Sequence, residues 1–350
     1  MISRVQALAK RVSVTKIAIP VVVAIAGLAT YFAVAKVLFS AGASSIASWL
    51  AKASPLTLAA AIAIRAATVP LEACVFSLSA ASVKHHLRFS SSYRGICASL
   101  AMEYVLPFGG LTEVYKVFFY TRCGFTLNEA VAAMFVHRLA MSSSLLAMSI
   151  AVCMGIDLEP WIKGLILGTS TALAVTNVAG IAIAQVRKIG SALGKWAESL
   201  VDRFVSRLIA LPPGYDSVFE FREVSLRMSS VLAAFSIACL EHLAIAFSGY
   251  LTVLSLGIEM NFVQALFVFD VIQSVLWLLP AVTPGSIGVL ETVQLAALKA
   301  ISLGPSVAAA PLLYRIVILC SMLPQLMPML VTDVASFLKE FEKPRVSLGT

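Results

Sequence analysis

Charged residues are scarce in this 350-residue chain. Asp, Glu, Lys and Arg make up 13% of it, whereas hydrophobic residues make up 60% and the mean hydropathy is +0.94. A soluble domain carries about 25% charged residues, so this composition excludes a soluble protein with a large core. Three charge-free runs, Ile17–Ala35, Gly164–Val186 and Val271–Leu290, are 19, 23 and 20 residues long. About 20 apolar residues span the hydrocarbon core of a bilayer, so the sequence predicts a polytopic integral membrane protein.

Signatures of several other protein classes are missing. The six cysteines occur singly without metal-ligand spacing, so we expect neither disulfides nor a metal site. Walker A, HExxH, GxSxG and Rossmann glycine patterns are absent, so we expect no enzyme, no catalytic residue and no cofactor. Uphill transport would then need an ion gradient or a partner. The net charge of +8 is explained by basic residues at the cytoplasmic ends of helices, not by nucleic-acid binding.

The apolar segments predict an all-α bundle within a single transmembrane domain, residues 1–350. Six segments have the length of full spans: 17–38, 55–83, 126–155, 161–186, 228–256 and 306–332. The stretches 95–122 and 262–302 are broken by Pro and Gly into halves of about 14 to 20 residues. At 1.5 Å per residue the shorter halves cannot cross about 30 Å, so we predict two re-entrant helical hairpins. In the alternative, the longer halves span fully and give eight or more crossings.

Basic residues fix the predicted orientation. They gather at the N-terminus and in segments 84–94 and 187–227, whereas the opposite loops contain few. The positive-inside rule therefore predicts cytoplasmic N- and C-termini, in the cell (cytoplasmic) membrane. Within segment 188–224, apolar residues recur every three or four positions from Ile189 to Leu208. This pattern predicts an amphipathic helix on the cytoplasmic interface, with a partner helix as the alternative.

Two halves of the chain share a pattern. Pro107-Phe-Gly-Gly-Leu-Thr-Glu113 and Pro284-Gly-Ser-Ile-Gly-Val-Leu-Glu291 each place a Pro/Gly break before a glutamate. Arg138 and Arg315 follow these glutamates after 25 and 24 residues. Residues 55–155 and 228–332 are thus predicted to be two copies of span, broken hairpin and span. The single extra span between them inverts the second copy, which is a transporter pattern with the site where the broken helices meet.

Ionisable residues at membrane depth are costly and usually functional. The predicted substrate-binding residues are Arg138, Arg315, Glu113, Glu291, Glu103, Lys116, Glu241 and Asp270. The predicted hairpin breaks are Pro107, Gly109, Gly110, Pro284, Gly285 and Gly288. The planar fork of arginine suits phosphate, and the N–H groups at the start of a half-helix attract anions.

Structural readings compete with these functional ones. In the structural reading, the glutamates complement a helix dipole and the Arg–Glu pairs hold helices together. Arg65 and Glu72, seven apart on one helix face, favour a local structural role. His242, beside Glu241, either relays protons or is a packed, hydrogen-bonded residue.

The segment from Pro280 to Glu291, together with Pro107–Glu113 and the His137-Arg138 helix, resembles the transmembrane region of the lysylphosphatidylglycerol synthase/flippase family. The resemblance covers roughly residues 15 to 335. It implies a flippase-like unit that moves a phospholipid or polyprenyl-phosphate-linked headgroup through a cavity, with no soluble synthase domain. Ser286, Phe108-Gly109-Gly110 and His137 depart from the family pattern, and these departures bear on the substrate more than on the fold.

The expected partners are membrane lipids and a lipid or lipid-linked substrate, without nucleic acid, and a homo-oligomer is left open. One alternative is a small-solute or ion secondary transporter on the same architecture. Another is a membrane-embedded enzyme or an accessory subunit of a lipid or glycan pathway. A sealed cavity with no lateral opening would favour the small-solute or ion transporter. Clustered metal-binding carboxylates would favour the enzyme, and an obligate partner would favour the accessory subunit.

Overall fold

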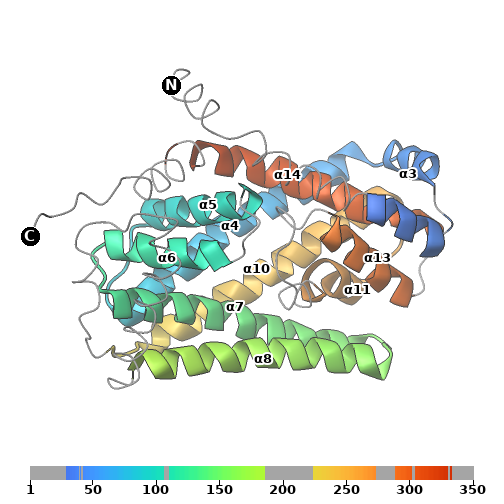
Figure 1. The fold of residues 1–350 in the computed structure, drawn as a ribbon. Coiled ribbons are helices and arrows are strands. Elements are labelled where there is room, and N and C mark those ends of the chain that lie inside the picture. Colours follow the sequence, from blue (N-terminus) through green and yellow to red (C-terminus); the bar gives the residue numbers. More distant parts are fainter. Residues whose placement is uncertain are drawn as a thin grey trace, which may run out of the picture.

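The computed structural model describes residues 29–38, 40, 42–105, 110–185, 224–272, 288–301, 304–329 and 332. Within these ranges the chain is helical and contains no strand (Figure 1). The helices long and apolar enough to cross a bilayer are α4 (Pro55–Val83), α7 (Leu127–Gly155), α8 (Pro160–Gln185), α10 (Met228–Ser255), and η5 (Pro305–Ala309) joined to α14 (Ala310–Met329). They confirm an all-α polytopic membrane protein, and they match five of the six predicted full spans within a few residues.

The remaining predicted span, 17–38, is described only from residue 29 onward. Helix Ala29–Leu38 meets α3 (Ala43–Leu50) at an angle of 93°, so the two count as one span only if they are taken together as a bent pair. The Tyr31 hydroxyl donates a hydrogen bond to the carbonyl of Ala308 in η5. This bond ties the N-terminal helix to the last span.

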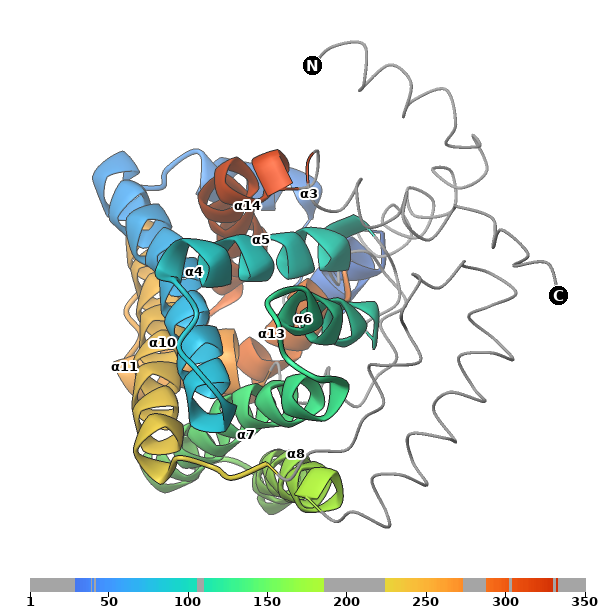
Figure 2. The same ribbon diagram turned by 90° about the vertical axis from the view of Figure 1, so that its left-hand side faces the viewer.

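Helices α4 and α10 form an antiparallel pair with an extensive contact, and they lie side by side along one side of the bundle in Figure 2. The Ser54 N–H, just before α4, donates to the Ser255 carbonyl at the end of α10 (2.8 Å). The Arg227 N–H, just before α10, donates to the Ser82 carbonyl near the end of α4 (2.8 Å). Each helix start is thus bonded to the other helix end. The alanine-rich sequence of α4 permits this close approach, because small side chains let backbones come together.

The first broken stretch forms a helical hairpin. Helix α5 (Phe89–Val105) packs against α6 (Gly110–Arg122), and residues 106–109 between them lie outside the described ranges. Gly95 near the start of α5 faces Phe119 near the end of α6, because a Cβ on Gly95 would lie 2.9 Å from the ring. The two helices are therefore antiparallel. At 13 residues α6 is about 20 Å long, too short to cross a hydrocarbon core of about 30 Å.

The second broken stretch combines α11 (Phe262–Leu266), the π-helix η3 (Phe267–Val271) and α13 (Val289–Ala300). Residues 273–287 lie outside the described ranges. Asn261 caps α11 by accepting the Gln264 N–H at 2.8 Å. The predicted length of about 14 to 20 residues per half was too long for α13, which has 12. The reason is Gly288, whose φ of +83° stops the helix from extending further back.

Helix α8 lies at the edge of the bundle along α7 (Figure 1). Asn177 Nδ2 donates to the Ser142 hydroxyl at 3.0 Å, and the hydroxyls of Ser149 and Ser170 are 2.8 Å apart. These polar contacts hold two largely apolar helices together. The predicted amphipathic segment, residues 188–224, lies outside the described ranges except for its last residue.

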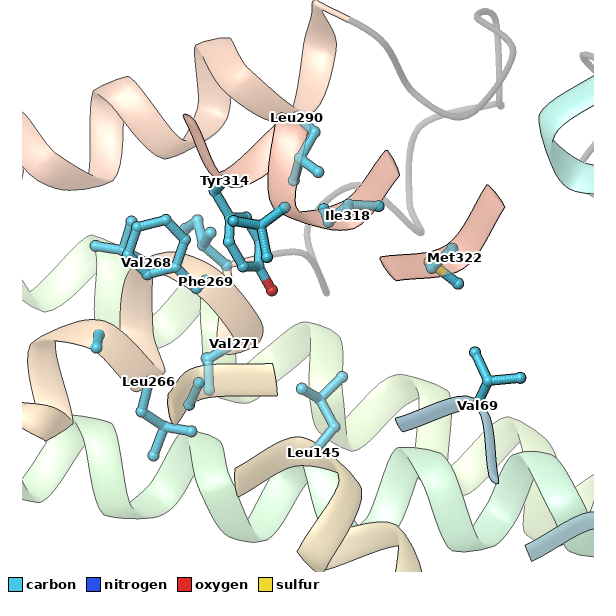
Figure 3. Packing of buried hydrophobic residues seen from close by; sticks show 14 of the residues in the cluster. Val69, Leu145, Leu266, Val268, Phe269, Val271, Leu290, Tyr314, Ile318 and Met322 are labelled. Atoms are coloured by element: carbon cyan, nitrogen blue, oxygen red, sulfur yellow. The ribbon is translucent and has the colours of Figure 1, made fainter. Parts of the chain in front are cut away.

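One cluster of buried apolar residues joins helices from both halves of the chain. Figure 3 shows buried side chains of this cluster from α4, α7, η3, α13 and α14: Val69, Leu145, Phe269, Leu290 and Tyr314. The rings of Phe269 and Tyr314 are 4.7 Å apart, and both side chains are fully buried. This apolar packing holds the charged residues of the neighbouring turns in fixed positions.

Candidate functional site

One charged cluster lies where α6 meets α7. Glu113 and Lys116 are one turn apart on α6, with Lys116 Nζ 3.6 Å from Glu113 Oε1. Arg138 on α7 places Nη1 3.4 Å from the same oxygen. Glu113 Oε2 has no hydrogen-bond partner. Tight charge-assisted hydrogen bonds measure about 2.7–2.9 Å, so both contacts to this oxygen are longer than a tight ion-pair hydrogen bond.

Glu72 joins this cluster from the middle of α4. Its Oε1 lies 3.8 Å from Lys116 Nζ and 3.9 Å from His137 Nε2. Both ring nitrogens of His137 lack hydrogen-bond partners, although the side chain is buried. Arg65 instead donates to the Thr68 hydroxyl at 2.6 Å, and the described residues hold no Arg65–Glu72 ion pair. Glu72 therefore contacts neighbouring helices in addition to the charge of Arg65 on its own helix, and the local structural role of Arg65 and Glu72 stays a prediction.

A second Glu–Arg pair joins α13 to α14. Arg315 Nε donates to Glu291 Oε1, and the Gly288 N–H donates to Glu291 Oε2 at 2.6 Å. Both carboxylate oxygens are therefore used. The Gly288 N–H, at the start of this half-helix, is therefore not available to an anion, because Glu291 reaches back one turn and accepts its hydrogen bond. An anion site on the other N–H groups of this helix start stays a prediction.

The two pairs differ in access. The side chains of Glu113 and Arg138 are 21% and 33% exposed, whereas those of Glu291 and Arg315 are 1% and 9% exposed. The first pair is reachable and loosely bonded, and the second is sealed and tightly bonded. Glu–Arg pairs with nearly the same sequence spacing, 25 and 24 residues, thus occupy different environments in one structure.

A third polar group lies between α10 and η3. His242 Nδ1 is 2.7 Å from Asp270 Oδ1, and His242 Nε2 is 3.2 Å from the Met141 carbonyl of α7. Glu241, in the middle of α10, is 4% exposed, and its Oε2 has no hydrogen-bond partner. Asp270 lies in the π-helical turn η3. Such turns are rare and often occur at functional sites.

The predicted site residues fall into groups. The structure brings Glu113, Lys116 and Arg138 together, pairs Glu291 with Arg315, and places Asp270 and Glu241 beside His242. Of the predicted breaks, Gly110 begins α6 and Gly288 precedes α13. The Glu103 side chain and residues Pro107, Gly109, Pro284 and Gly285 lie outside the described part of the chain.

Four further residues belong to these groups: Glu72, His137, His242 and Gln294. The sequence singled out Glu72 and His242 as polar residues at membrane depth without assigning them to the binding site, whereas it assigned no such role to His137 or Gln294. Gln294 is fully buried one turn after Glu291 on α13, and both of its amide atoms lack partners. Intramembrane polarity alone was the signal available for them, because their neighbours lie on other helices. The described residues contain no group of three or more His, Cys, Asp or Glu side chains placed to hold a metal ion.

These features define a class: a polytopic α-helical membrane protein that holds several ionisable groups in the middle of its spans, beside short hairpin helices. Residues 17–324 match the lysylphosphatidylglycerol synthase TM region family. The chain belongs to this family, as the Pro/Gly-glutamate segments suggested. No curated protein matches the chain.

Proposed function

We propose that this protein is a flippase-type lipid transporter that moves a phosphate-bearing headgroup across the cell membrane, with Arg138 as the main phosphate ligand. The main observation in support is that Arg138 is accessible and lies 3.4 Å from Glu113. The chain also belongs to a family related to membrane lipids. A guanidinium fork binds phosphate through two hydrogen bonds. The headgroup would take Arg138 from Glu113, which keeps Lys116 as its partner.

The transport path we propose runs between inverted repeats formed by residues 55–155 and 228–332. The reciprocal bonds at the ends of α4 and α10 support a two-fold relation between them. The helix contacts of the two halves also correspond. Helix α5 packs on α4 as α11 packs on α10, and α6 packs on α7 as α13 packs on α14. The open Glu113–Arg138 pair and the sealed Glu291–Arg315 pair then represent opposite halves of one alternating-access cycle. In the other state the second pair would open, and Arg315 would hold the headgroup.

The substrate class is a phospholipid or a polyprenyl-phosphate-linked sugar, and both offer the same phosphate chemistry. The orientation we propose keeps the N- and C-termini in the cytoplasm, so that the hairpin of α5 and α6 opens toward the cytoplasm. A lipid substrate needs the headgroup to enter sideways from the bilayer. A small-solute transporter on the same fold would instead open only to water.

Replacing Arg138 with alanine is expected to slow headgroup movement about ten- to a hundred-fold, because hydrogen bonds to a charged group contribute about 1.5–3 kcal/mol. The measurement uses proteoliposomes with trace fluorescent phosphatidylglycerol and membrane-impermeant quenching of the outer leaflet. Arg138→Lys should retain part of the rate, because it keeps the charge but loses the fork. Lys163→Ala, at the start of the peripheral helix α8, is the matched control and should move lipid at the unaltered rate.

Arg138→Ala and Arg315→Ala combined should abolish movement. Unchanged rates in this double variant, with the protein folded by size-exclusion chromatography, would exclude the assignment. Uptake of inorganic phosphate without any lipid movement would support the small-solute alternative instead.

A further inference from the structure

Three largely buried acidic side chains from different elements lie close enough to influence one another electrostatically, and one of them, Glu72, belongs to the Arg138 cluster. Glu241 of α10 interacts electrostatically with Glu72 of α4 and Asp270 of η3. Arg65 and Lys116 are the cations that act on Glu241. Facing groups also come from α7, whose His137 approaches Glu72 and whose Met141 carbonyl contacts His242. Polar or charged groups from α4, α7, α10 and η3 therefore surround Glu241 and His242.

The contacts of His242 favour an extra proton. Its Nε2 lies against the Met141 carbonyl, which only accepts hydrogen bonds, so Nε2 carries a hydrogen. The other ring nitrogen, Nδ1, lies 2.7 Å from the Asp270 carboxyl oxygen. A neutral imidazole with hydrogen on Nε2 has only a lone pair at Nδ1, which would repel a carboxylate at that distance. Either the ring is an imidazolium or Asp270 is protonated, and in both cases the pair holds one proton more than a neutral histidine and a carboxylate.

A charge count of the described cluster gives the same number. Its carboxylates are Glu72, Glu113, Glu241 and Asp270, and its permanent cations are Arg65, Lys116 and Arg138. With both histidines neutral, four carboxylates face three permanent cations among the side chains that the structure describes, which leaves an excess of one negative charge in that set. One bound proton makes the cluster neutral, as an interior of low dielectric favours. The Glu291–Arg315 pair is neutral by itself.

Glu241 offers a place for a second proton. Its side chain is 4% exposed, its Oε2 has no hydrogen-bond partner, and it directly precedes His242 in the chain. A headgroup phosphate with one negative charge at Arg138 would return the cluster to a net charge of −1. Protonation of the Glu241 carboxylate would restore neutrality. Buried Asp, Glu and His chains serve as proton relays in other transporters.

We infer that Glu241, His242 and Asp270 form a proton-binding site, and that this site couples headgroup movement to the proton gradient. The coupling rests on the proposed lipid transport, whereas the proton site stands on the geometry alone. The His242–Asp270 pair holds the resident proton. Glu241 takes up one further proton from water when the anionic headgroup binds and releases it when the headgroup leaves. Headgroup and proton thus move in the same direction, and the combined step carries no net charge.

The first test concerns the proton site and needs no transport. Nitrogen NMR of ¹⁵N-histidine-labelled protein in bilayers, assigned with His242→Gln, reports whether both ring nitrogens of His242 carry hydrogen. Infrared absorption of protonated carboxyl groups, measured for the unaltered protein and for Asp270→Asn, reports whether the extra proton lies on Asp270 instead. We expect one of the two signals at neutral pH. A neutral His242 together with an ionised Asp270 would overturn the site.

The second test measures coupling with trace fluorescent phosphatidylglycerol in buffered proteoliposomes. With a gradient of one pH unit, the label should accumulate in the leaflet on the alkaline side by up to about tenfold, because one pH unit is a tenfold ratio of proton activity. A membrane potential should not change this ratio. Glu241→Gln, checked for folding by size-exclusion chromatography, should give an even distribution under the same gradient.

The outcomes separate the two proposals. Lipid movement that ignores the pH gradient, or that follows a sodium gradient instead, would overturn the coupling and leave lipid transport standing. No lipid movement under any condition would overturn both lipid transport and its coupling, while the NMR and infrared signals would still decide whether the proton site exists.

Discussion

Arg315→Ala is expected to lower the free energy of unfolding by about 3–5 kcal/mol, because it leaves the buried Glu291 carboxylate without its cation. The Glu291 side chain is 1% exposed, and its other oxygen is already engaged by the Gly288 N–H. Water cannot reach the carboxylate to replace the arginine. Thermal unfolding of the detergent-solubilised protein, followed by size-exclusion chromatography after heating, measures the loss.

Two controls isolate this effect. Arg315→Met combined with Glu291→Gln removes both charges, and the glutamine oxygen can still accept the Gly288 N–H, so this pair should recover most of the stability. Arg138→Ala should cost much less, because Arg138 and Glu113 are partly exposed and Lys116 remains beside Glu113. Equal losses from Arg315→Ala and Arg138→Ala would show that the second pair is not sealed.

Gly249→Val is expected to destabilise the protein by about 3 kcal/mol, the upper part of the range for overpacking. Gly249 lies on α10 where η3 crosses it, and a Cβ there would be 2.3 Å from Cγ of the Phe269 ring. The ring cannot move aside freely, because it is fully buried and lies against Tyr314. The substitution should therefore displace η3 and with it Asp270, which lies next to Phe269 in the chain.

A second substitution, at Phe269, tests whether this clash causes the loss of stability. Phe269→Ala alone is expected to destabilise the protein by about 3–5 kcal/mol. Combined with Gly249→Val it also removes the clash, so the double variant should lose less stability than the sum of the two single losses. Gly168→Ala on α8 is the matched control, since nothing lies within 4 Å of its added Cβ, and it should be neutral or slightly stabilising. Thermal unfolding compares all four proteins. Additive effects of the two changes would contradict the contact.

The spans could be predicted from the sequence because one physical requirement dominates them. A helix in lipid needs about 20 apolar residues, and the chain interrupts such runs with charges or Pro/Gly. Helix α4 begins at Pro55, whose missing N–H suits the first turn, and ends one residue before Lys84. The sequence predicted this span as 55–83, which are its observed bounds.

Part of the charged site was also predictable. Glu113 and Arg138 lie 25 residues apart, and Glu291 and Arg315 lie 24 apart, each across a short hairpin helix and its return. Such spacing brings them together in both halves, and the structure gives each glutamate its arginine. Their unequal exposure has no signature in the sequence, because it depends on how the two halves pack in this state.

The His242–Asp270 pair could not be predicted. The two residues are 28 positions apart on different elements, and Asp270 is placed by a π-helical turn that has no sequence pattern. Glu72 was likewise assigned to its own helix face, because Arg65 is its neighbour in sequence, whereas its actual contacts come from α6 and α7. Contacts between spans depend on helix rotation, which hydropathy does not specify.

The most direct test of headgroup transport is a cryo-electron microscopy structure in nanodiscs that contain phosphatidylglycerol. We expect lipid density that enters between the hairpins, with its phosphate within hydrogen-bond distance of the Arg138 guanidinium and with Glu113 paired to Lys116 alone. Density confined to the outer surface of the bundle, with Arg138 still paired to Glu113 and no lateral opening in any state, would contradict headgroup transport.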